Sequence, residues 1–114
     1  MAVKNPNEPF TRITVGEAAQ MMAKGEVQVV DVREPHEYTS GHVPGAVLIP
    51  INPVTGFMQR KDELSREVPI IFVCGVGQRS ALACEVAAAL GFADLYNLEG
   101  GTEDWIKSGQ PVQK

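Results

Sequence analysis

Cys74 is the side chain whose surroundings most clearly indicate chemistry. It follows an apolar, mostly β-branched run at residues 70–73, which is typical of a buried strand, and it precedes two glycines, Gly75 and Gly77. The glycines allow a sharp turn that points successive backbone N–H groups toward one position. A helix is predicted to follow, and its positive end would stabilise a thiolate. The stretch therefore predicts a nucleophilic thiol suited to sulfur or phosphoryl chemistry.

The residues after the cysteine form the predicted substrate-binding loop. They are Gly75, Val76, Gly77, Gln78, Arg79 and Ser80. Arg79 could bind a substrate anion or fold back to hold loop carbonyls, and the structural role is favoured. Ser80 could donate to the sulfur of Cys74 or cap the following helix, and capping alone explains a serine there. No histidine base lies nearby in sequence, and a preformed thiolate needs none.

Other reactive side chains have structural explanations. Cys84 lies about one helical turn beyond Ser80, so reaching Cys74 would require local unfolding, and we expect a buried free thiol. His36 and His42 lie in polar turns, where His42 is expected to hold the turn.

Three further side chains near the predicted sheet also have ordinary structural explanations. Asp31 and Arg33 end a predicted strand at the edge where Cys74 lies, and they are expected to form an ion pair. Trp105 is expected to pack against the sheet.

The elements that must position the loop alternate along the chain. Apolar runs predict strands at residues 27–32, 46–49, 70–73 and 93–98, and helices are predicted at 17–24, 36–38, 81–90 and 103–108. Thr14 and Glu17 match a capping box, and Gly25 and Gly91 are placed to end helices. Residues 1–12 suggest an extended or frayed lead-in, and residues 57–64 a helical turn or two. Such alternation predicts a parallel sheet covered by helices on both faces, with ligands at the carboxyl ends of its strands.

Composition narrows the class of protein and its partners. The chain has 114 residues, enough for one domain, with 44% hydrophobic and 21% charged residues. Its net charge of −4 and its lack of a basic cluster argue against nucleic acid and anionic membranes as partners. No signal peptide or membrane span is visible, and two cysteines do not resemble a disulfide scaffold or zinc site. We therefore expect a cytoplasmic protein, with a monomer as the default.

Three stretches together resemble the rhodanese family of sulfurtransferases. They are residues 31–38 running into 41–46, residues 74–80 matching C-x-x-G-x-R-[ST], and Gly100-Gly101 with Trp105, Gly109, Pro111 and Val112. Each motif alone is weak, but their order and spacing agree from about residue 14 to residue 112. The resemblance implies one domain over residues 1–114 with a three-layer α/β fold, in which helices cover both faces of a parallel sheet of about five strands.

The resemblance also implies a reaction. Cys74 would take a sulfane sulfur from thiosulfate or a low-molecular-weight persulfide and pass it from a Cys74 persulfide to a thiol or cyanide, with no cofactor or metal. Loop N–H groups from Gly75 to Ser80 would stabilise the sulfur anion. The most active thiosulfate-using members often carry basic residues where this chain has Gly75 and Val76. A persulfide is therefore expected to be the better donor.

Two other functions stay open at the level of sequence. One is a sulfur-relay or redox-sensing module that docks a protein partner, such as a protein sulfur acceptor, and turns over small molecules poorly. The other is a phosphatase or arsenate reductase, by loop analogy. Cysteine phosphatases place five residues between cysteine and arginine, whereas four lie between Cys74 and Arg79. A smaller loop fits sulfur better than phosphate, so phosphatase activity is disfavoured.

Overall fold

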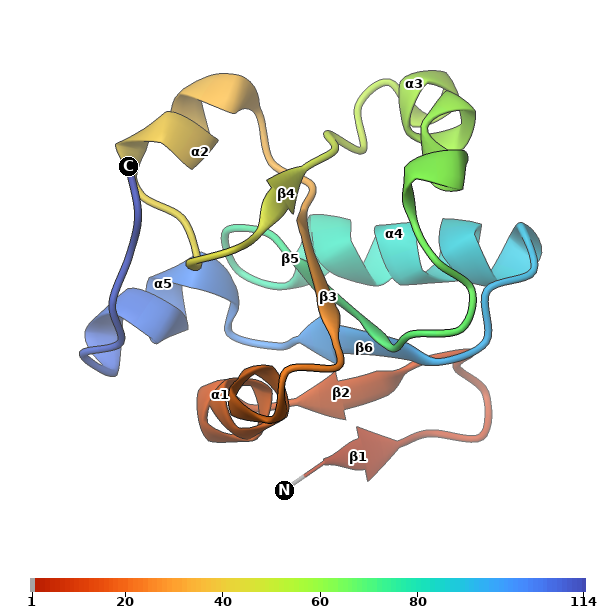
Figure 1. Ribbon diagram of the computed structural model, residues 1–114. Helices are drawn as coiled ribbons and strands as arrows, with labels where there is room; N and C mark the ends of the chain where they lie inside the picture. The colour runs from red at the N-terminus through yellow and green to blue at the C-terminus, as the bar shows by residue number, and fades with distance from the viewer. Residues whose placement is uncertain (1) are drawn as a thin grey trace.

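A six-stranded sheet forms the middle of the computed structural model, which describes residues 2–114 (Figure 1). Its strands, in spatial order, are β1 (Val3–Lys4), β2 (Thr11–Ile13), β6 (Leu95–Leu98), β5 (Ile70–Val73), β3 (Gln28–Asp31) and β4 (Val47–Leu48). Every neighbouring pair is parallel except β1 with β2. The predicted α/β fold with a mainly parallel sheet is confirmed, with six strands in place of about five.

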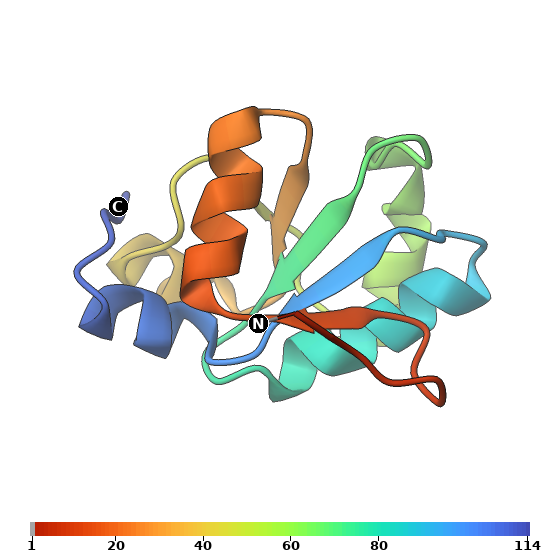
Figure 2. The same cartoon turned by 90° about the horizontal axis from the view of Figure 1, so that it is seen from below.

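Helices cover both faces of the sheet (Figure 2). They are α1 (Val15–Lys24), α2 (Pro35–Ser40), α3 (Val54–Gln59), a short 3-10 helix (Lys61–Glu63), α4 (Gln78–Ala89) and α5 (Gly101–Lys107). The helices α1 and α5 lie on one face, and α3 and α4 lie on the other (Figure 2). Within residues 2–114, no helix is both long and apolar enough to cross a bilayer.

Strand β5 is central because it is buried on both faces. All four of its residues are inaccessible to solvent. Ile70 and Phe72 pack in the core cluster under α3 and α4, while Ile71 and Val73 pack in the cluster that contains Trp105. Such two-sided burial explains its continuous apolar sequence. The strand is thereby held in place, and so is the residue that follows its carboxyl end.

The N-terminal segment contributes more structure than its sequence predicts. Of the two alternatives for this lead-in, extended or frayed, the structure shows the extended one: residues 3–4 and 11–13 form β1 and β2, with Pro6 and Pro9 in the connection between them. Strand β2 is short and gains its pairing from β6, whose residues lie more than eighty positions later in the chain. Local sequence patterns do not show a pairing over such a separation, so they do not predict β2.

The predicted capping box at the start of α1 is confirmed. The hydroxyl of Thr14 accepts a hydrogen bond from the backbone N–H of Glu17 at 3.2 Å, and the Glu17 carboxylate accepts one from the N–H of Thr14 at 2.8 Å. Gly25 ends the helix with φ 88°, the left-handed conformation that glycine adopts without steric cost. Both ends of α1 are therefore set by local chemistry.

We predict that Thr14→Ala lowers the free energy of unfolding by about 1 kcal/mol, because it removes the side-chain acceptor for the first turn of α1. Urea denaturation monitored by circular dichroism measures the change. Thr14→Ser, which keeps the hydroxyl, serves as the control and should lose much less. Equal midpoints for Thr14→Ala and the parent chain would contradict the expectation.

Candidate active site

Cys74 lies where β5 ends, at the carboxyl edge of the sheet, and only 1% of its surface is exposed. The loop of residues 74–77 leads directly into α4. Gly77 occupies the N-cap of this helix with φ 94°, so α4 begins at Gln78, three residues earlier than predicted. The expectation that Ser80 caps the helix is therefore wrong, because Ser80 lies inside the first turn and its side chain faces the sulfur.

Hydrogen-bond donors from the loop and from the first turn of α4 surround the sulfur. The backbone N–H of Gly77 donates to Cys74 Sγ at 3.1 Å, and the hydroxyl oxygen of Ser80 lies 3.3 Å from it. Burial opposes ionisation of the thiol, but hydrogen bonding from the hydroxyl and N–H of Ser80 and the N–H groups of Gly77 and Val76 outweighs it. The net effect lowers the pKa of Cys74 below its ordinary value. The site therefore favours a thiolate.

The start of α5 holds the loop in this conformation. The N–H of Thr102 donates to the carbonyl of Cys74 at 2.8 Å, and the N–H of Glu103 donates to the carbonyl of Gly75 at 3.1 Å. With these two carbonyls bound to α5, the loop is held with the N–H of Gly77 directed at the sulfur. The backbones approach so closely that a Cβ on Gly101 would lie 2.4 Å from the Gly75 oxygen. This contact explains why glycine is required at position 101.

Arg79 extends over the loop and pairs with α2. Its guanidinium donates two hydrogen bonds to the carboxylate of Glu37, at 2.7 and 2.9 Å, in place of the loop carbonyls that were expected to be its partners. One guanidinium nitrogen would lie 3.2 Å from a Cβ on Gly75, so the side chain lies against the loop. The hydrogen bonds from Arg79 lower the pKa of Glu37 to about 2, despite the opposing effect of burial. The pair therefore stays ionised at neutral pH.

Asn97 is a site residue that the sequence-based expectations do not include. Its side-chain oxygen lies in hydrogen-bond contact with the Ser80 hydroxyl, and its Nδ2 donates to the carbonyl of Gly77 at 3.1 Å and to the Glu99 carboxylate at 2.7 Å. The sequence pattern predicts Asn97 only as one position of a strand. The available signal is a polar residue between Leu95 and Leu98 in a stretch expected to be a strand.

Three of the remaining candidates, Asp31, Arg33 and His42, hold the structure around the site. Asp31 and Arg33 form the expected ion pair at 2.8 Å, and both are buried. The ring of His42 stacks on Tyr38 at 3.6 Å and is bonded to the Tyr38 carbonyl, while its backbone pairs with Gln113 near the C-terminus. These three contacts confirm the expected structural roles at the turn.

The two remaining candidates are also buried. Trp105 packs in the core, and its indole N–H donates to the Pro111 carbonyl at 2.7 Å. Cys84 is a buried free thiol whose pKa is raised, chiefly by burial. Both agree with their predicted structural roles.

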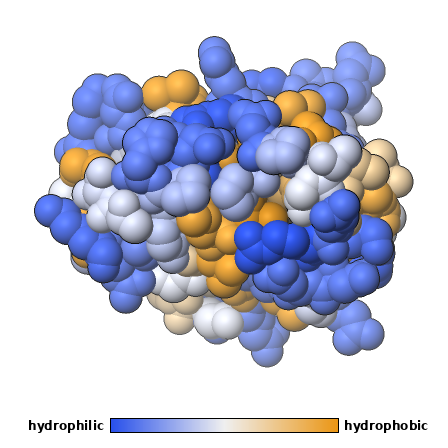
Figure 3. All heavy atoms as spheres, turned by 90° about the horizontal axis from the view of Figure 1, so that it is seen from above, coloured by the Kyte–Doolittle hydropathy of each residue, from blue (hydrophilic) through white to orange (hydrophobic). Residues whose placement is uncertain are grey.

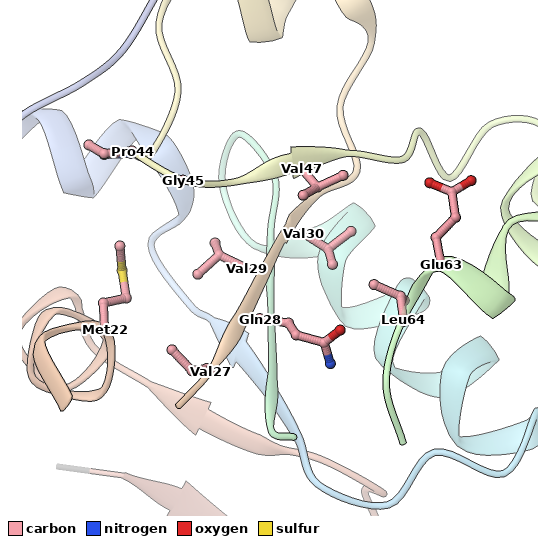
Figure 4. Close-up of a pocket in the computed structure, with 10 residues that line it drawn as sticks. All are labelled: Met22, Val27, Gln28, Val29, Val30, Pro44, Gly45, Val47, Glu63 and Leu64. Carbon is pink, nitrogen blue, oxygen red and sulfur yellow. The ribbon is translucent and has the colours of Figure 1, made fainter. Parts of the chain in front are cut away.

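A separate pocket of about 490 Å³ lies away from Cys74, beside the outer edge of β3 (Figure 4). Its lining residues are Met22, Val27, Gln28, Val29, Val30, Pro44, Gly45, Val47, Glu63 and Leu64. The face that carries α2, β4 and α3 shows an apolar strip between hydrophilic groups (Figure 3). Within residues 2–114, no group of three or more His, Cys, Asp or Glu side chains is arranged to hold a metal ion.

Comparisons with known proteins agree on one family. A model of the rhodanese-like domain matches residues 14–108. The chain is 31% identical over 96 residues to the thiosulfate sulfurtransferase GlpE of Pseudoalteromonas translucida, covering 84% of this chain and 89% of that protein.

Solved structures show the same likeness. A rhodanese-related protein from Thermoplasma volcanium superposes with a TM-score of 0.78 at 30% identity, covering 90% of this chain and 96% of that one. A rhodanese-like domain protein from Staphylococcus aureus gives a TM-score of 0.76 at 31% identity, covering 90% and 98%.

We predict that Cys74 titrates below an ordinary thiol and Cys84 above one. The thiolate fraction of Cys74 should fall as pH drops through its lowered pKa. The ultraviolet absorbance of the thiolate, followed against pH, measures both groups. Cys74→Ala should abolish the lower transition and Cys84→Ala should leave it. A lower transition that persists in Cys74→Ala would contradict this assignment.

Proposed function

Because the chain belongs to the rhodanese-like family, we propose that it is a sulfurtransferase that carries the transferred sulfur on Cys74. The observation that supports this most is the contact of Cys74 Sγ with the Gly77 N–H and the Ser80 hydroxyl at the end of β5. Sulfur transfer needs a thiolate nucleophile and a means of holding a sulfur anion, and hydrogen-bond donors directed at the sulfur support both requirements. The thiosulfate sulfurtransferase among the relatives is in line with the same chemistry.

The proposed reaction has two displacements. The Cys74 thiolate attacks the sulfane sulfur of the donor, a new S–S bond forms, and the donor's S–S bond breaks with its electron pair leaving on sulfite or a thiolate. A thiolate or cyanide then attacks the outer sulfur, and the Cys74 thiolate is the leaving group. No proton transfer is needed in either step. The N–H groups from Gly75 to Ser80 would hold the negative charge on the outer sulfur of the intermediate.

The charges around the loop favour a persulfide donor over thiosulfate. Arg79 is neutralised by Glu37, and Arg33 by Asp31. The rim residue Val76 is apolar and 53% exposed. A dianion such as thiosulfate would find no unpaired cation on Arg33 or Arg79, so its attraction to the loop is weak. A persulfide whose carboxylates lie several bonds from the transferred sulfur does not depend on such a cation.

A protein sulfur acceptor or donor is a second candidate, and the exposure of Val76 supports it. This side chain lies two residues after Cys74 and projects from the loop into solvent. An exposed apolar side chain beside a reactive group is suited to contact with a partner protein. In that case the chain would act as a sulfur relay, with slow turnover of small molecules.

Intact-mass spectrometry tests the proposed function. The reduced protein is incubated with glutathione persulfide and, separately, with thiosulfate. We predict a mass gain of one sulfur atom that cyanide removes, with faster loading from the persulfide, because the loop presents no unpaired cation to thiosulfate.

The control is Cys74→Ala, which should gain nothing, whereas Cys84→Ala should load normally. If neither donor loads the parent chain, the proposed small-molecule reaction is rejected. Loading that occurs only from a protein persulfide would favour the relay.

A charge change on α2 tests the donor preference. We predict that Glu37→Gln raises the rate of loading from thiosulfate about threefold to tenfold at low salt, because the positive charge of Arg79 is no longer neutralised beside the loop. The increase should shrink as salt is added. Loading from glutathione persulfide should change less, so the ratio of the two rates is the measurement.

Glu63→Gln is a matched control for this variant. It removes the same charge from an arginine–glutamate pair, Arg60 with Glu63 at 2.8 Å, that contributes no residue to the Cys74 loop. Its thiosulfate rate should equal that of the parent chain. A rise in both variants would show an effect of net charge alone, and a rise in neither would contradict the role assigned to the Arg79–Glu37 pair.

A further inference from the structure

The hydroxyl of Ser80 has one proton and two acceptors. Its oxygen lies 3.3 Å from Cys74 Sγ and in closer contact with the side-chain oxygen of Asn97. A hydroxyl donates one hydrogen bond at a time, so the two acceptors compete for it. Ser80, Asn97 and Cys74 are all buried, which keeps bulk water from supplying a replacement donor.

The oxygen of Asn97 is held toward Ser80 by what its amide nitrogen contacts. Nδ2 donates to the Gly77 carbonyl and to the Glu99 carboxylate, both of which are acceptors only. Rotating the amide would place its oxygen against two other oxygens. Glu99 is itself held by Arg12 at 2.8 Å. The network therefore determines the amide orientation and leaves Oδ1 as a permanent acceptor beside Ser80.

We propose that Asn97 is a positioning residue that controls ionisation of Cys74 by competing with its sulfur for the hydroxyl proton of Ser80. When Cys74 is a neutral thiol, the hydroxyl donates to Asn97 Oδ1, since a thiol sulfur is a weak acceptor. When Cys74 is a thiolate, the negative charge draws the hydroxyl to the sulfur. Asn97 thus stabilises the states in which the sulfur is neutral.

The consequence for catalysis rests on the proposed sulfur transfer. Once a persulfide forms, the charge lies on the outer sulfur and the Cys74 sulfur is no longer an anion. The hydroxyl of Ser80 then returns to Asn97 without leaving a buried donor unpaired. The hydrogen bond to Asn97 therefore offsets part of the stabilisation that is lost when Ser80 no longer donates to a thiolate. This favours transfer of sulfur onto the cysteine.

A double-mutant cycle on the free enzyme tests the competition. In a Cys84→Ala background, the Cys74 thiolate is titrated by ultraviolet absorbance with and without Ser80→Ala, in three chains: the parent, Asn97→Ala and Asn97→Asp. The measured quantity is the fold loss of thiolate at fixed pH caused by Ser80→Ala in each chain.

The expected losses follow the strength of the competing acceptor. Ser80→Ala should lower the thiolate-to-thiol ratio about threefold in the parent chain and about tenfold with Asn97→Ala, where the sulfur is the sole remaining acceptor. Asn97→Asp keeps an acceptor oxygen toward Ser80, and protonation of its carboxyl beside Glu99 supplies a donor in place of Nδ2, so the loss there should be about threefold or less.

Other charged groups near the sulfur do not affect this comparison. Arg79 and Glu37 at the loop, Asp31 and Arg33 at the end of β3, and Glu99 after β6 are present in every member of the cycle. Any charge that Asn97→Asp adds is likewise present both with Ser80 and with Ser80→Ala. The effects of these charges on the thiolate-to-thiol ratio therefore cancel when the fold loss is calculated.

Equal losses with and without Asn97 would reject the competition. A smaller loss with Asn97→Ala than in the parent would also reject it, and would show that Asn97 helps Ser80 reach the sulfur. If circular dichroism shows that Asn97→Ala does not fold, the near-isosteric Asn97→Asp replaces it. A fold loss of thiolate on Ser80→Ala that is larger in Asn97→Asp than in the parent chain would then reject the proposal. No sulfur donor is present, so the outcome is independent of whether the enzyme transfers sulfur.

Discussion

The site depends on the contact between the start of α5 and the carbonyls of the cysteine loop. The N–H groups of Thr102 and Glu103 bind the carbonyl oxygens of Cys74 and Gly75. These bonds hold the loop in the conformation in which the N–H of Gly77 meets the sulfur. The approach is close enough to require glycine at position 101, which joins the C-terminal part of the chain to the chemistry of a residue in its middle.

The donors that stabilise a thiolate at Cys74 are uncharged, and this determines how the site can attract a substrate. The sulfur receives hydrogen bonds from backbone N–H groups and a hydroxyl, while the nearby guanidinium of Arg79 is occupied by Glu37. Neutral donors are directional and act at short range, whereas a free cation attracts anions from a distance. This arrangement is the basis for proposing a substrate that brings a sulfur atom into the loop over one drawn in by its charge.

Features governed by local interactions could be predicted from the sequence. The capping box of Thr14 and Glu17 involves neighbours three residues apart, and β5 was predicted with the bounds that the structure shows. The start of α4 was predicted too late, because a glycine with φ 94° at position 77 can begin a helix without a capping side chain. Strand β2 could not be predicted, since its partner β6 lies far along the chain.

The sequence alone determined the candidate nucleophile and the class of site proposed for it, because Cys74, its glycines and the strand before it are contiguous. The tertiary structure decided the surroundings of this thiol. Glu37 neutralises Arg79 from 42 residues away, and Asn97 contacts Ser80 from 17 residues away. Neither sequence separation corresponds to a helical or strand repeat, so no periodic pattern in the sequence predicts the contact. Helices that pack against the parallel sheet bring these side chains together. Each side chain therefore meets its partner only in the folded protein.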